Sequence, residues 1–590
     1  MRNIFTCFIL IIFGFFCISE KTFSADLQIQ ISEDYKNGKI SYHQYLVYQG
    51  YLIFSPEKIY DVYPGIKIEN AIKSGTGIIL ELMENWDILT EGEKSFFSQF
   101  IQQRPTGLDK SIISPSGYFK VHYTTRTGNI NKIPSADLNE NDVPDYAEET
   151  ALALDKSRSL YVDTLGFLPP VSDGGIDGPE FDIYLKDLAT IYGQTFFPPN
   201  VFIEVDNDFK EEIYNTKGVN ALKVTCAHEL HHAVQFSYII RSQDFFFYEA
   251  TSTLMEDMVF DEINDYYQYL PKLFKSTQTP FNTKDGFHEY GLSIWGHFLN
   301  KKYDRFIMRK IWDKFKRNIP VLNAIDETLM EKGNTFADDL NEFYIWNFFT
   351  GSRADEVNYY NDGSDYPEIE RINYVSVTKD TVISISNKYL TPNYILLEGL
   401  IPTSYEINAK TIDKVSIELW RNKMILFEKL NPSIPVFFKN ADSLTNTAEF
   451  MNQGIDSKAL IVSTSVARTN NSAPYSQGDY NMNVEVKIKN IDYKVNRIRE
   501  IYPNPFIYGE HNSLSIAFSL EKTMDVRFLI ISSSGRIVKI IERKNMSEGL
   551  HPVTWNGLNE DNVPVPSGIY LVQFRTDDSS ETKKIAIIRK

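Results

Sequence analysis

The stretch VTCAHELHHAVQFSY, from Val224 to Tyr238, places ionisable side chains inside an otherwise apolar run of helical periodicity. Four of them fall within five positions: His228, Glu229, His231 and His232. Polar groups on a buried helix are costly unless they find partners, so the fold must bring partners to this helix. Leu222, Cys226 and Leu230 recur at four-residue steps, which predicts that this face packs against a core.

Residues four apart on a helix lie on one face, so His228 and His232 can direct two imidazoles at one metal ion. This is the HExxH pattern, and it predicts a zinc site with Glu229 beside the ligands. A catalytic zinc site keeps one position for water, and Glu229 would take a proton from that water. His231 lies about 100° round the helix and is expected outside the ligand set. The alternative is a set of polar residues within an ordinary core helix.

A second helical run, FFFYEATSTLMEDMVFDE, follows and carries Glu249 and Glu256 on one face. HExxH followed by the Glu of EAT on the next helix resembles the gluzincin metallopeptidases. The resemblance implies that His228, His232 and Glu249 hold zinc and that Glu229 is the general base. Glu256 is the alternative ligand, or a residue that contacts the ligands or solvent.

The segment HEYGLSIWGHFLNKKYD begins at His288. It resembles the stretch after the zinc helices of aminopeptidase-like gluzincins, in which a tyrosine shortly before a glycine stabilises the oxyanion. Tyr290 adjoins Gly291, whereas His288 occupies the family's tyrosine spacing, so either is a candidate catalytic residue. The alternative is that both only cap and pack a helix.

An acidic loop upstream, DLNENDVPDYAE, has the ligand spacing of an EF-hand-type calcium loop. Positions 1, 3, 5, 7, 9 and 12 are Asp137, Asn139, Asn141, Val143, Asp145 and Glu148. Asp142 stands where glycine is usual and Pro144 is foreign to an EF-hand, and in these respects the loop resembles thrombospondin- or dockerin-type calcium loops instead. The alternative is a solvated acidic turn.

The chain of 590 residues is too long for one hydrophobic core. Residues 1–25 have the basic start, apolar run and small-residue end of a signal peptide. Residues 26–115 look mainly helical and resemble a leader or prodomain, and residues 116–365 show the alternation of an α+β domain. HYTT, the acidic loop, YGQT, VDNDF and the two helices together resemble a family of secreted bacterial metallopeptidases, which implies a zincin-like domain.

Two all-β domains are expected after the α+β domain. Short β-branched and aromatic runs across residues 372–495 predict a β-sandwich. Residues 497–590 carry YPNPF, then WNG and SGIY. This order resembles the Ig-like C-terminal sorting domain of type IX secretion substrates or the Ig-like module of flagellar hook-capping proteins. The resemblance implies contact with secretion machinery and a secreted or cell-surface location in a Gram-negative bacterium; the alternative is an accessory adhesion domain.

Composition excludes some partners. The net charge of -18 disfavours nucleic acid, which needs clustered Lys and Arg. Signal removal takes Cys7 and Cys17, leaving Cys226 and no internal disulfide, and no other run reaches bilayer length. The sequence thus predicts a secreted zinc peptidase acting on protein or peptide, with TFF near 195 or FIEVD near 204 as the sheet edge that binds substrate backbone. The alternative is a surface or adhesion protein with a structural metal clamp.

Overall fold

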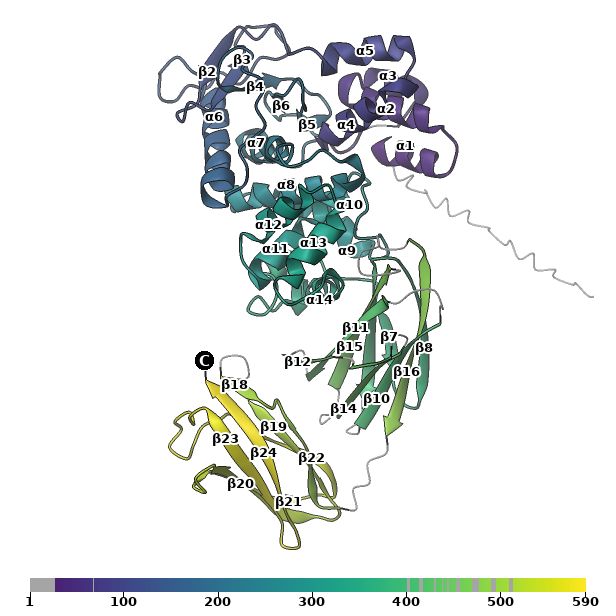
Figure 1. Cartoon of the computed structure of the whole chain (residues 1–590), viewed down its shortest axis with the longest axis vertical. Helices are drawn as coiled ribbons and strands as arrows, with labels where there is room; N and C mark the ends of the chain where they lie inside the picture. The colour runs from purple at the N-terminus through teal and green to yellow at the C-terminus, as the bar shows by residue number, and fades with distance from the viewer. Residues whose placement is uncertain are drawn as a thin grey trace, which may run out of the picture.

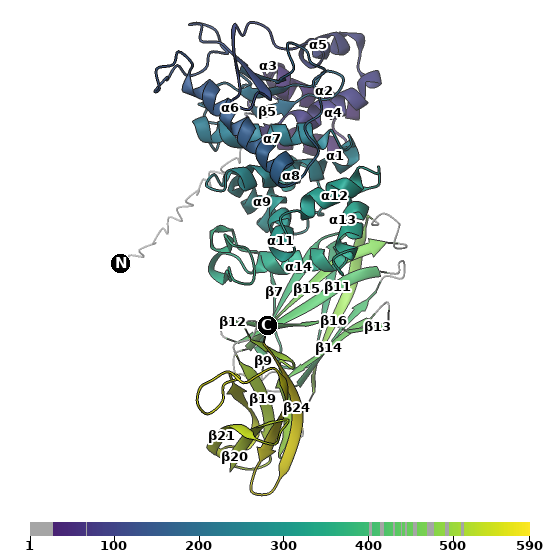
Figure 2. The same ribbon diagram turned by 60° about the vertical axis from the view of Figure 1, so that its left-hand side comes forward.

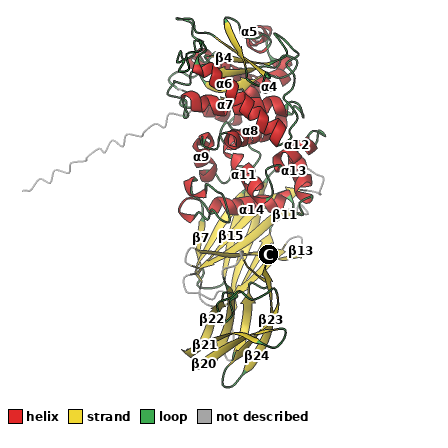
Figure 3. Cartoon of the chain, turned by 90° about the vertical axis from the view of Figure 1, so that its left-hand side faces the viewer, coloured by secondary structure: helices red, strands yellow, loops and turns green. Residues whose placement is uncertain are grey.

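The structure is a computed structural model. It describes residues 27–66, 68–400, 404–412, 418–428, 431–437, 439–442, 445–451, 457–468, 477–489, 495–508 and 513–589. The predicted signal peptide lies outside the described residues. The described part is multidomain: helices and one mixed sheet form the N-terminal half, and mostly antiparallel sheets form the C-terminal half (Figures 1 and 3).

Five helices form the leader and gather beside the mixed sheet (Figure 1). They are α1 (Leu27–Lys36), α2 (Tyr42–Phe54), α3 (Glu57–Val62), α4 (Thr76–Glu84) and α5 (Glu91–Ile101). Ser41 and Thr90 begin α2 and α5 with capping boxes, which satisfy backbone N–H groups at the helix starts. The leader also contains a short strand that the sequence patterns did not predict, β1 (Ile72–Ser74).

The mixed sheet has six strands in the order β1-β5-β6-β4-β3-β2. The other five are β2 (Lys110–Ile113), β3 (Phe119–Tyr123), β4 (Phe181–Lys186), β5 (Ile191–Thr195) and β6 (Ile203–Asp206). β5 runs antiparallel to β6 and parallel to β1. The expectation that FIEVD forms a sheet edge is wrong, because β6 lies between β5 and β4. The TFF stretch begins at the last residue of β5, whose outer edge is occupied by β1.

Helices beside the sheet and below it build the largest core (Figure 1). They are α6 (Asp145–Arg158), α7 (Gly218–Gln235), α8 (Phe245–Val259), α9 (Leu270–Lys275), α10 (His288–Gly291), α11 (Ser293–Lys302), α12 (Ile307–Phe315), α13 (Val321–Met330) and α14 (Phe336–Phe348). α7 packs against β5, β6, α6 and α8, so it lies at the centre of this half (Figure 2). Trp295 and Trp312 are fully buried among the helices below it. The predicted site helix is therefore a central element of the core.

A β-sandwich follows α14. One sheet holds β7 (Asn373–Ser376), β9 (Pro392–Leu400), β11 (Glu418–Glu428), β12 (Asn431–Phe437) and β15 (Ser457–Arg468). The other holds β8 (Thr381–Lys388), β10 (Ser404–Thr411), β13 (Lys439–Asp442), β14 (Thr445–Met451) and β16 (Asp479–Lys489). Asn341 of α14 donates to the Val462 carbonyl of β15 at 2.9 Å. The sandwich is thus fastened to the helical half.

The C-terminal domain packs a three-stranded sheet on a five-stranded one. The strands are β17 (Arg497–Tyr502), β18 (Phe506–Tyr508), β19 (Leu514–Leu520), β20 (Met524–Ser532), β21 (Ile537–Met546), β22 (Gly549–Trp555), β23 (Gly568–Arg575) and β24 (Ser580–Arg589). Alternate residues face inward, and Phe518, Phe528, Trp555 and Phe574 belong to a core separate from the other domains. Of the helices in the described ranges, none has the length and apolar character needed for a bilayer span.

Candidate metal centre

Helix α7 brings the two predicted histidine ligands together. His228 and His232 lie one turn apart and are fully buried, with ring centroids 4.8 Å apart. Glu249 reaches them from α8, which packs against α7. Its Oε2 lies 3.0 Å from His228 Nε2 and 3.5 Å from His232 Nε2, and the two Nε2 atoms are 3.1 Å apart. Within the described part of the chain this group of metal-ligating side chains has three members.

The opposite ring nitrogens fix the tautomers. His228 Nδ1 lies 2.7 Å from the Glu256 carboxylate, which can only accept, so Nδ1 carries the hydrogen. His232 Nδ1 lies 2.7 Å from Gln235 Oε1, and the Gln235 amide nitrogen donates to the Tyr248 carbonyl. In their neutral forms, both imidazoles therefore turn their Nε2 lone pairs toward the same point. Three acceptor atoms converge there, and only a proton or a cation between them makes the arrangement favourable.

The donor set suits zinc. Bonds of about 2.0–2.1 Å at tetrahedral angles place ligand atoms roughly 3.4 Å apart. The three separations here, 3.0, 3.1 and 3.5 Å, bracket that spacing. Two imidazoles and one carboxylate are also the ligand types that zinc binds in three-ligand catalytic sites. His228, His232 and Glu249 could therefore hold this ion without rearranging the helices.

The electrostatics of the cluster reflect the same convergence. Burial alone would lower the pKa of His228, but the hydrogen bonds with Glu249 and Glu256 outweigh it and raise the pKa to about 9. Burial would raise the pKa of Glu249, but His232 and His228 lower it to about 2. The pocket therefore favours positive charge at its centre and a negative charge on Glu249.

Glu229 contacts β5 and the leader. Its Oε2 accepts a hydrogen bond from the Thr195 hydroxyl at 2.7 Å and one from the Thr76 hydroxyl at 3.0 Å. Among the described residues its Oε1 has no hydrogen-bond partner, although the atom is buried. Gly193 permits this close packing, because a Cβ there would lie 2.9 Å from Glu229 Cγ. Two hydroxyl groups thus hold Oε2 in place, whereas Oε1 has no hydrogen-bond partner within the described residues.

Glu256 lies behind the ligands and joins them to the leader. Its Oε1 bonds His228, and its Oε2 lies 2.8 Å from Lys73 Nζ of β1. Lys73 also pairs with Asp265 at 2.6 Å, and all of these groups are buried. Two carboxylates raise the pKa of the Lys73 ammonium against the effect of burial. Glu256, which the sequence offered as the alternative ligand, therefore orients the proposed ligand His228 through the Nδ1 side of its ring.

His231 lies apart from the metal group. Its Nδ1 is 3.1 Å from the Ser252 hydroxyl, and its ring packs edge-on against Tyr161 and Phe167. Burial lowers its pKa well below the usual value. It is a neutral histidine of the core, consistent with its position 100° round the helix.

The two candidates for stabilising an oxyanion face different spaces. The Tyr290 ring lies 6.2 Å from the His228 ring and lines the cavity that reaches Glu249. Burial first, and then Glu249, raise the pKa of its phenol, and a hydrogen bond from the Ser74 backbone acts in the other direction. His288 lines a second, smaller cavity with Leu292. The geometry therefore favours Tyr290 over His288 for a role at the metal centre.

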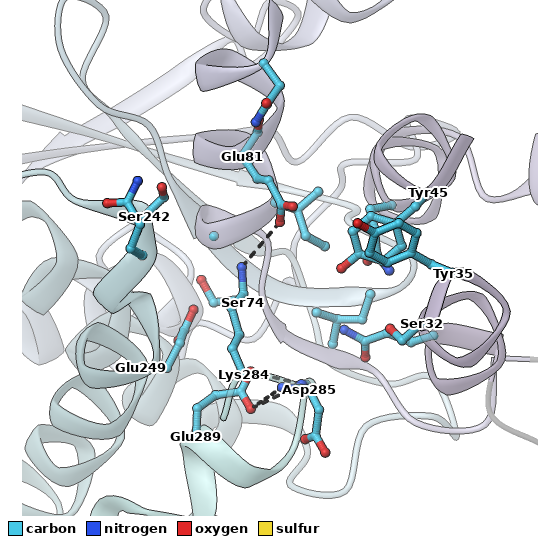
Figure 4. A pocket seen from close by; sticks show the side chains of 18 of the residues that line it. Ser32, Tyr35, Tyr45, Ser74, Glu81, Ser242, Glu249, Lys284, Asp285 and Glu289 are labelled. Carbon is cyan, nitrogen blue, oxygen red and sulfur yellow. Dashed lines mark hydrogen bonds and ion pairs between the residues drawn. The ribbon is translucent and has the colours of Figure 1, made fainter. Parts of the chain in front are cut away.

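A cavity of about 590 Å³ lies between the leader and the helical half. Tyr35, Tyr45 and Glu81 form its leader wall, while Glu249 and Glu289 lie on the opposite side (Figure 4). The Lys284 ammonium crosses the gap and lies 3.7 Å from the Glu81 carboxylate. The route to the metal centre is therefore walled on one side by leader residues.

The predicted calcium loop leads into α6, which begins at Asp145. The amides of Asn139 and Asn141 donate to the Glu148 carboxylate at 2.9 and 2.7 Å, and Asp137 accepts backbone N–H groups of the loop. Asp145 accepts from the Leu138 backbone at 3.0 Å. Most of these oxygens are satisfied within the loop, so calcium stays a prediction beside the acidic-turn alternative.

The sequence did not reveal the residues that contact His232, Glu229 and Glu256. Gln235 could have been found, because it lies three positions after His232 on the same helix. Thr195 is the last residue of the YGQT stretch, but no sequence pattern links its hydroxyl group to Glu229. Lys73 and Thr76 come from a segment more than 150 residues away, and nothing local marks them.

Comparison with protein families finds one match. Residues 507–580 match the model of the FlgD Ig-like domain, so the C-terminal domain is of the Ig-like type. The match covers residues 507–580 of this domain and no residue of the preceding domains. No curated protein matches the sequence.

Comparison with solved structures finds partial likenesses. One is PorZ, a surface component of the type IX secretion system of Porphyromonas gingivalis. The two sequences are 25% identical over a match that covers 15% of this chain and 11% of PorZ, and the TM-score is 0.13. Another is dimeric latent PorU from the same organism. It is 12% identical over a match that covers 37% of this chain and 19% of PorU, with a TM-score of 0.15. A third is the adhesin domain of Epf from Streptococcus pyogenes. It is 12% identical over a match that covers 35% of this chain and 77% of that domain, with a TM-score of 0.15. The chain spans only a small part of PorZ and PorU, and at these scores the likenesses carry no argument.

Proposed function

We propose that the protein is a secreted zinc-dependent peptidase. The observation that carries the proposal is the convergence of two Nε2 lone pairs and one carboxylate oxygen within 3.5 Å of one another. The three residues concerned are His228, His232 and Glu249. Buried acceptors do not gather in this way without a positive partner, and the spacing suits tetrahedral zinc.

The surrounding residues have roles that peptide hydrolysis needs. When bound, zinc supplies Lewis-acid polarisation. Glu229 Oε1 takes a proton from the attacking water, while Thr195 holds Oε2 in place. Glu256 keeps the hydrogen of His228 on Nδ1, so that Nε2 stays a ligand. Tyr290, on the cavity side, is the candidate hydrogen-bond donor to the developing oxyanion.

A structural metal clamp is the competing function, and two observations weigh against it. Clamps of this kind take four protein ligands, whereas the group at His228 holds three within the described residues. A clamp also has no use for a buried carboxylate oxygen left without a hydrogen-bond partner, as Glu229 Oε1 is among the described residues. Both features suit a site that receives water and substrate.

The proposed location is outside the cell or on its surface, reached through type IX secretion machinery. The FlgD-like Ig domain at the C-terminus supports this location, because the sorting domains of such substrates resemble it. The substrate class proposed is protein or peptide.

The experiment compares the zinc-loaded chain with Glu229→Gln, both intact and after limited proteolysis, on a denatured protein and a peptide library. We expect equal zinc content, measured by mass spectrometry, and hydrolysis reduced by roughly 10²- to 10⁴-fold in the variant. Glu262→Gln, at an exposed position in the turn after α8, is the matched control. Stoichiometric zinc with no hydrolysis in any form would favour the clamp instead.

A further inference from the structure

The outer edge of β5 is already paired by the leader. Ile72 of β1 lies opposite Ile191, and Ser74 lies opposite Gly193. The Ile72 N–H donates to the Thr190 carbonyl at 2.8 Å, and the Gly75 N–H donates to the Gly193 carbonyl at 3.0 Å. A free sheet edge offers such groups to an incoming extended chain. Here the chain's own leader uses them.

This edge runs directly over the metal-binding helix. Gly193 of β5 packs so closely on α7 that a Cβ there would lie 2.7 Å from Thr225 and 2.9 Å from Glu229. A peptide hydrogen-bonded to the outer edge of β5 is thereby held beside Glu229. The edge that β1 occupies is therefore the place where a substrate backbone would have to lie.

The residues after β1 reach into the proposed catalytic groups. The Thr76 hydroxyl donates to Glu229 Oε2 at 3.0 Å and accepts the Thr195 N–H at 2.8 Å. Ser74 of β1 and Tyr290 line the same cavity, and the Ser74 backbone acts on the pKa of the Tyr290 phenol. Leader atoms thus hold the general base and lie near the candidate oxyanion donor, the two groups that substrate and water would contact.

The leader helices contribute most of a hydrophobic cluster that is largely separate from the core of the helical half. Tyr184, Leu188, Ile191, Phe196 and Phe202 of the neighbouring domain also belong to this cluster. The connection between α5 and β2 is a loop in which Thr106 and Gly107 are exposed. Exposed loops with small and polar residues are preferred sites of proteolytic cleavage. One cut there separates the leader from the catalytic half.

We propose that residues 27–101 inhibit the site in the intact chain, with the Ile72–Thr76 segment occupying the β5 edge that an extended peptide substrate uses. The inference rests on the proposed peptidase function. Lys73, buried between Glu256 and Asp265, anchors the segment in this position. Cleavage in the loop at Thr106 and release of the leader would free the β5 edge, Glu229 and Tyr290 together.

The first test places a recognition site for a specific protease at Thr106–Gly107 of the otherwise unchanged chain. After cutting and removal of the leader, we expect peptide hydrolysis to rise at least tenfold at constant zinc content, and added leader to reverse the gain. Amide hydrogen exchange of Ile191–Thr195 is the second readout, and we expect it to become faster. An intact chain that cleaves as fast as the cut chain overturns the proposal, as does a cut that lowers activity.

The two proposals fail in different ways. If no form hydrolyses peptide although zinc is bound, the peptidase function fails, and hydrogen exchange alone decides whether the leader leaves the β5 edge. Exchange that rises on cutting and falls again when leader is added supports the displaceable strand. Exchange in Ile191–Thr195 that stays slow after the cut overturns it.

A substitution tests the same contact without cleavage. Thr76→Val keeps the side-chain shape but removes the hydroxyl that bonds Glu229. We expect residual activity of the intact chain to rise roughly tenfold, the effect of losing about one buried hydrogen bond. Thr127→Val, at an exposed turn outside the leader, is the matched control and leaves activity unchanged. If Thr76→Val leaves both activity and β5 exchange at the level of the control, the contact does not inhibit.

Discussion

Glu256 accepts a hydrogen bond of 2.7 Å from Nδ1 of His228 and thereby decides which nitrogen of that ring can bind a metal ion. The same carboxylate is tied to Lys73 at 2.8 Å, so its own orientation is fixed by the leader strand. Metal-binding histidines commonly donate their second N–H to a carboxylate, which raises the basicity of the ligand nitrogen. The contact links the proposed metal centre to β1 through a single buried side chain.

Glu256→Gln weakens zinc binding. The amide keeps the shape of the side chain but loses the charge that stabilises the His228 N–H, and substitutions of such partners cost about 10- to 100-fold in metal affinity. Competition with a chromophoric chelator measures the affinity directly. Glu262→Gln, exposed and six positions on, should bind zinc like the unaltered chain. Equal affinities for the two variants would remove Glu256 from the metal site.

Gly193→Ala separates zinc binding from hydrolysis. A methyl group there would lie 2.7 Å from Thr225 and 2.9 Å from Glu229, so β5 must move away from α7. The three ligands stand on α7 and α8 and keep their places. We expect zinc content to stay the same and hydrolysis by the leader-free chain to fall about 100-fold, the cost of roughly 1 Å of misplacement.

The control for this change is Gly568→Ala in β23, where an added Cβ comes no closer than 3.9 Å to a neighbouring atom. Peptide hydrolysis and zinc content are measured on the same preparations. Loss of zinc in Gly193→Ala, or full activity, would contradict the assignment of β5 as the strand that holds Glu229.

Asp257 makes stability fall as pH rises. Burial, with Asp261 and Asp362 adding to it, raises its pKa to about 8. An unfolded Asp loses its proton near pH 4, so between about pH 4 and 8 the folded state binds more protons and loses stability with rising pH. The nearby His297, its pKa lowered to about 4 by burial, acts in the opposite direction only below its ordinary pKa of about 6.5. Between pH 6.5 and 8, a comparison of the unaltered chain with an Asp257 variant therefore reports on Asp257 without the opposing effect of His297.

Asp257→Asn removes this dependence. We expect the free energy of unfolding of the variant, relative to the unaltered chain, to increase by up to about 1.4 kcal/mol per pH unit between pH 6.5 and 8. Denaturant unfolding at several pH values measures it. For Asp261→Asn, on the exposed turn after α8, the free energy of unfolding should follow the pH dependence of the unaltered chain more closely. A difference independent of pH would mean that Asp257 is already ionised in the folded state.

The parts of the site that sequence predicts are those governed by helix geometry. His228 and His232 are four apart, so any helix places them together, and Glu249 meets them because α7 and α8 are consecutive antiparallel neighbours. The order of domains follows from changes in periodicity. The Ig-like character of the C-terminus was likewise readable from YPNPF, WNG and SGIY, and the family match supports it.

Long-range sheet pairing explains what sequence did not predict. β1 is three residues long and pairs with β5 about 120 positions later, so its alternation is too short to recognise. FIEVD has the composition of either an edge or a central strand, and its neighbours decide which. Lys73 looks like an ordinary surface lysine, and its burial depends on Glu256 and Asp265 from distant elements.

The C-terminal domain is predicted to act in export alone. Its core, which includes Phe518, Phe528, Trp555 and Phe574, is separate from that of the preceding sandwich, so deleting residues 497–590 exposes little buried apolar surface elsewhere. We expect a chain ending at 496 to keep its zinc stoichiometry and the thermal unfolding of the catalytic half. In a bacterium with a type IX system, that chain should stay in the periplasm while the full chain reaches the surface or medium.

A point variant separates the fold of this domain from its mere presence. Trp555 is buried and donates its indole N–H to the Leu558 carbonyl at 2.8 Å, so Trp555→Ala costs about 3–5 kcal/mol and should unfold much of the domain. We expect fractionation and immunoblotting to find this variant in the periplasm. Val563→Ala, at an exposed position of the same domain, should be exported normally. Export of the chain ending at 496 would show that the signal lies elsewhere and would leave adhesion as the role of the Ig-like domain.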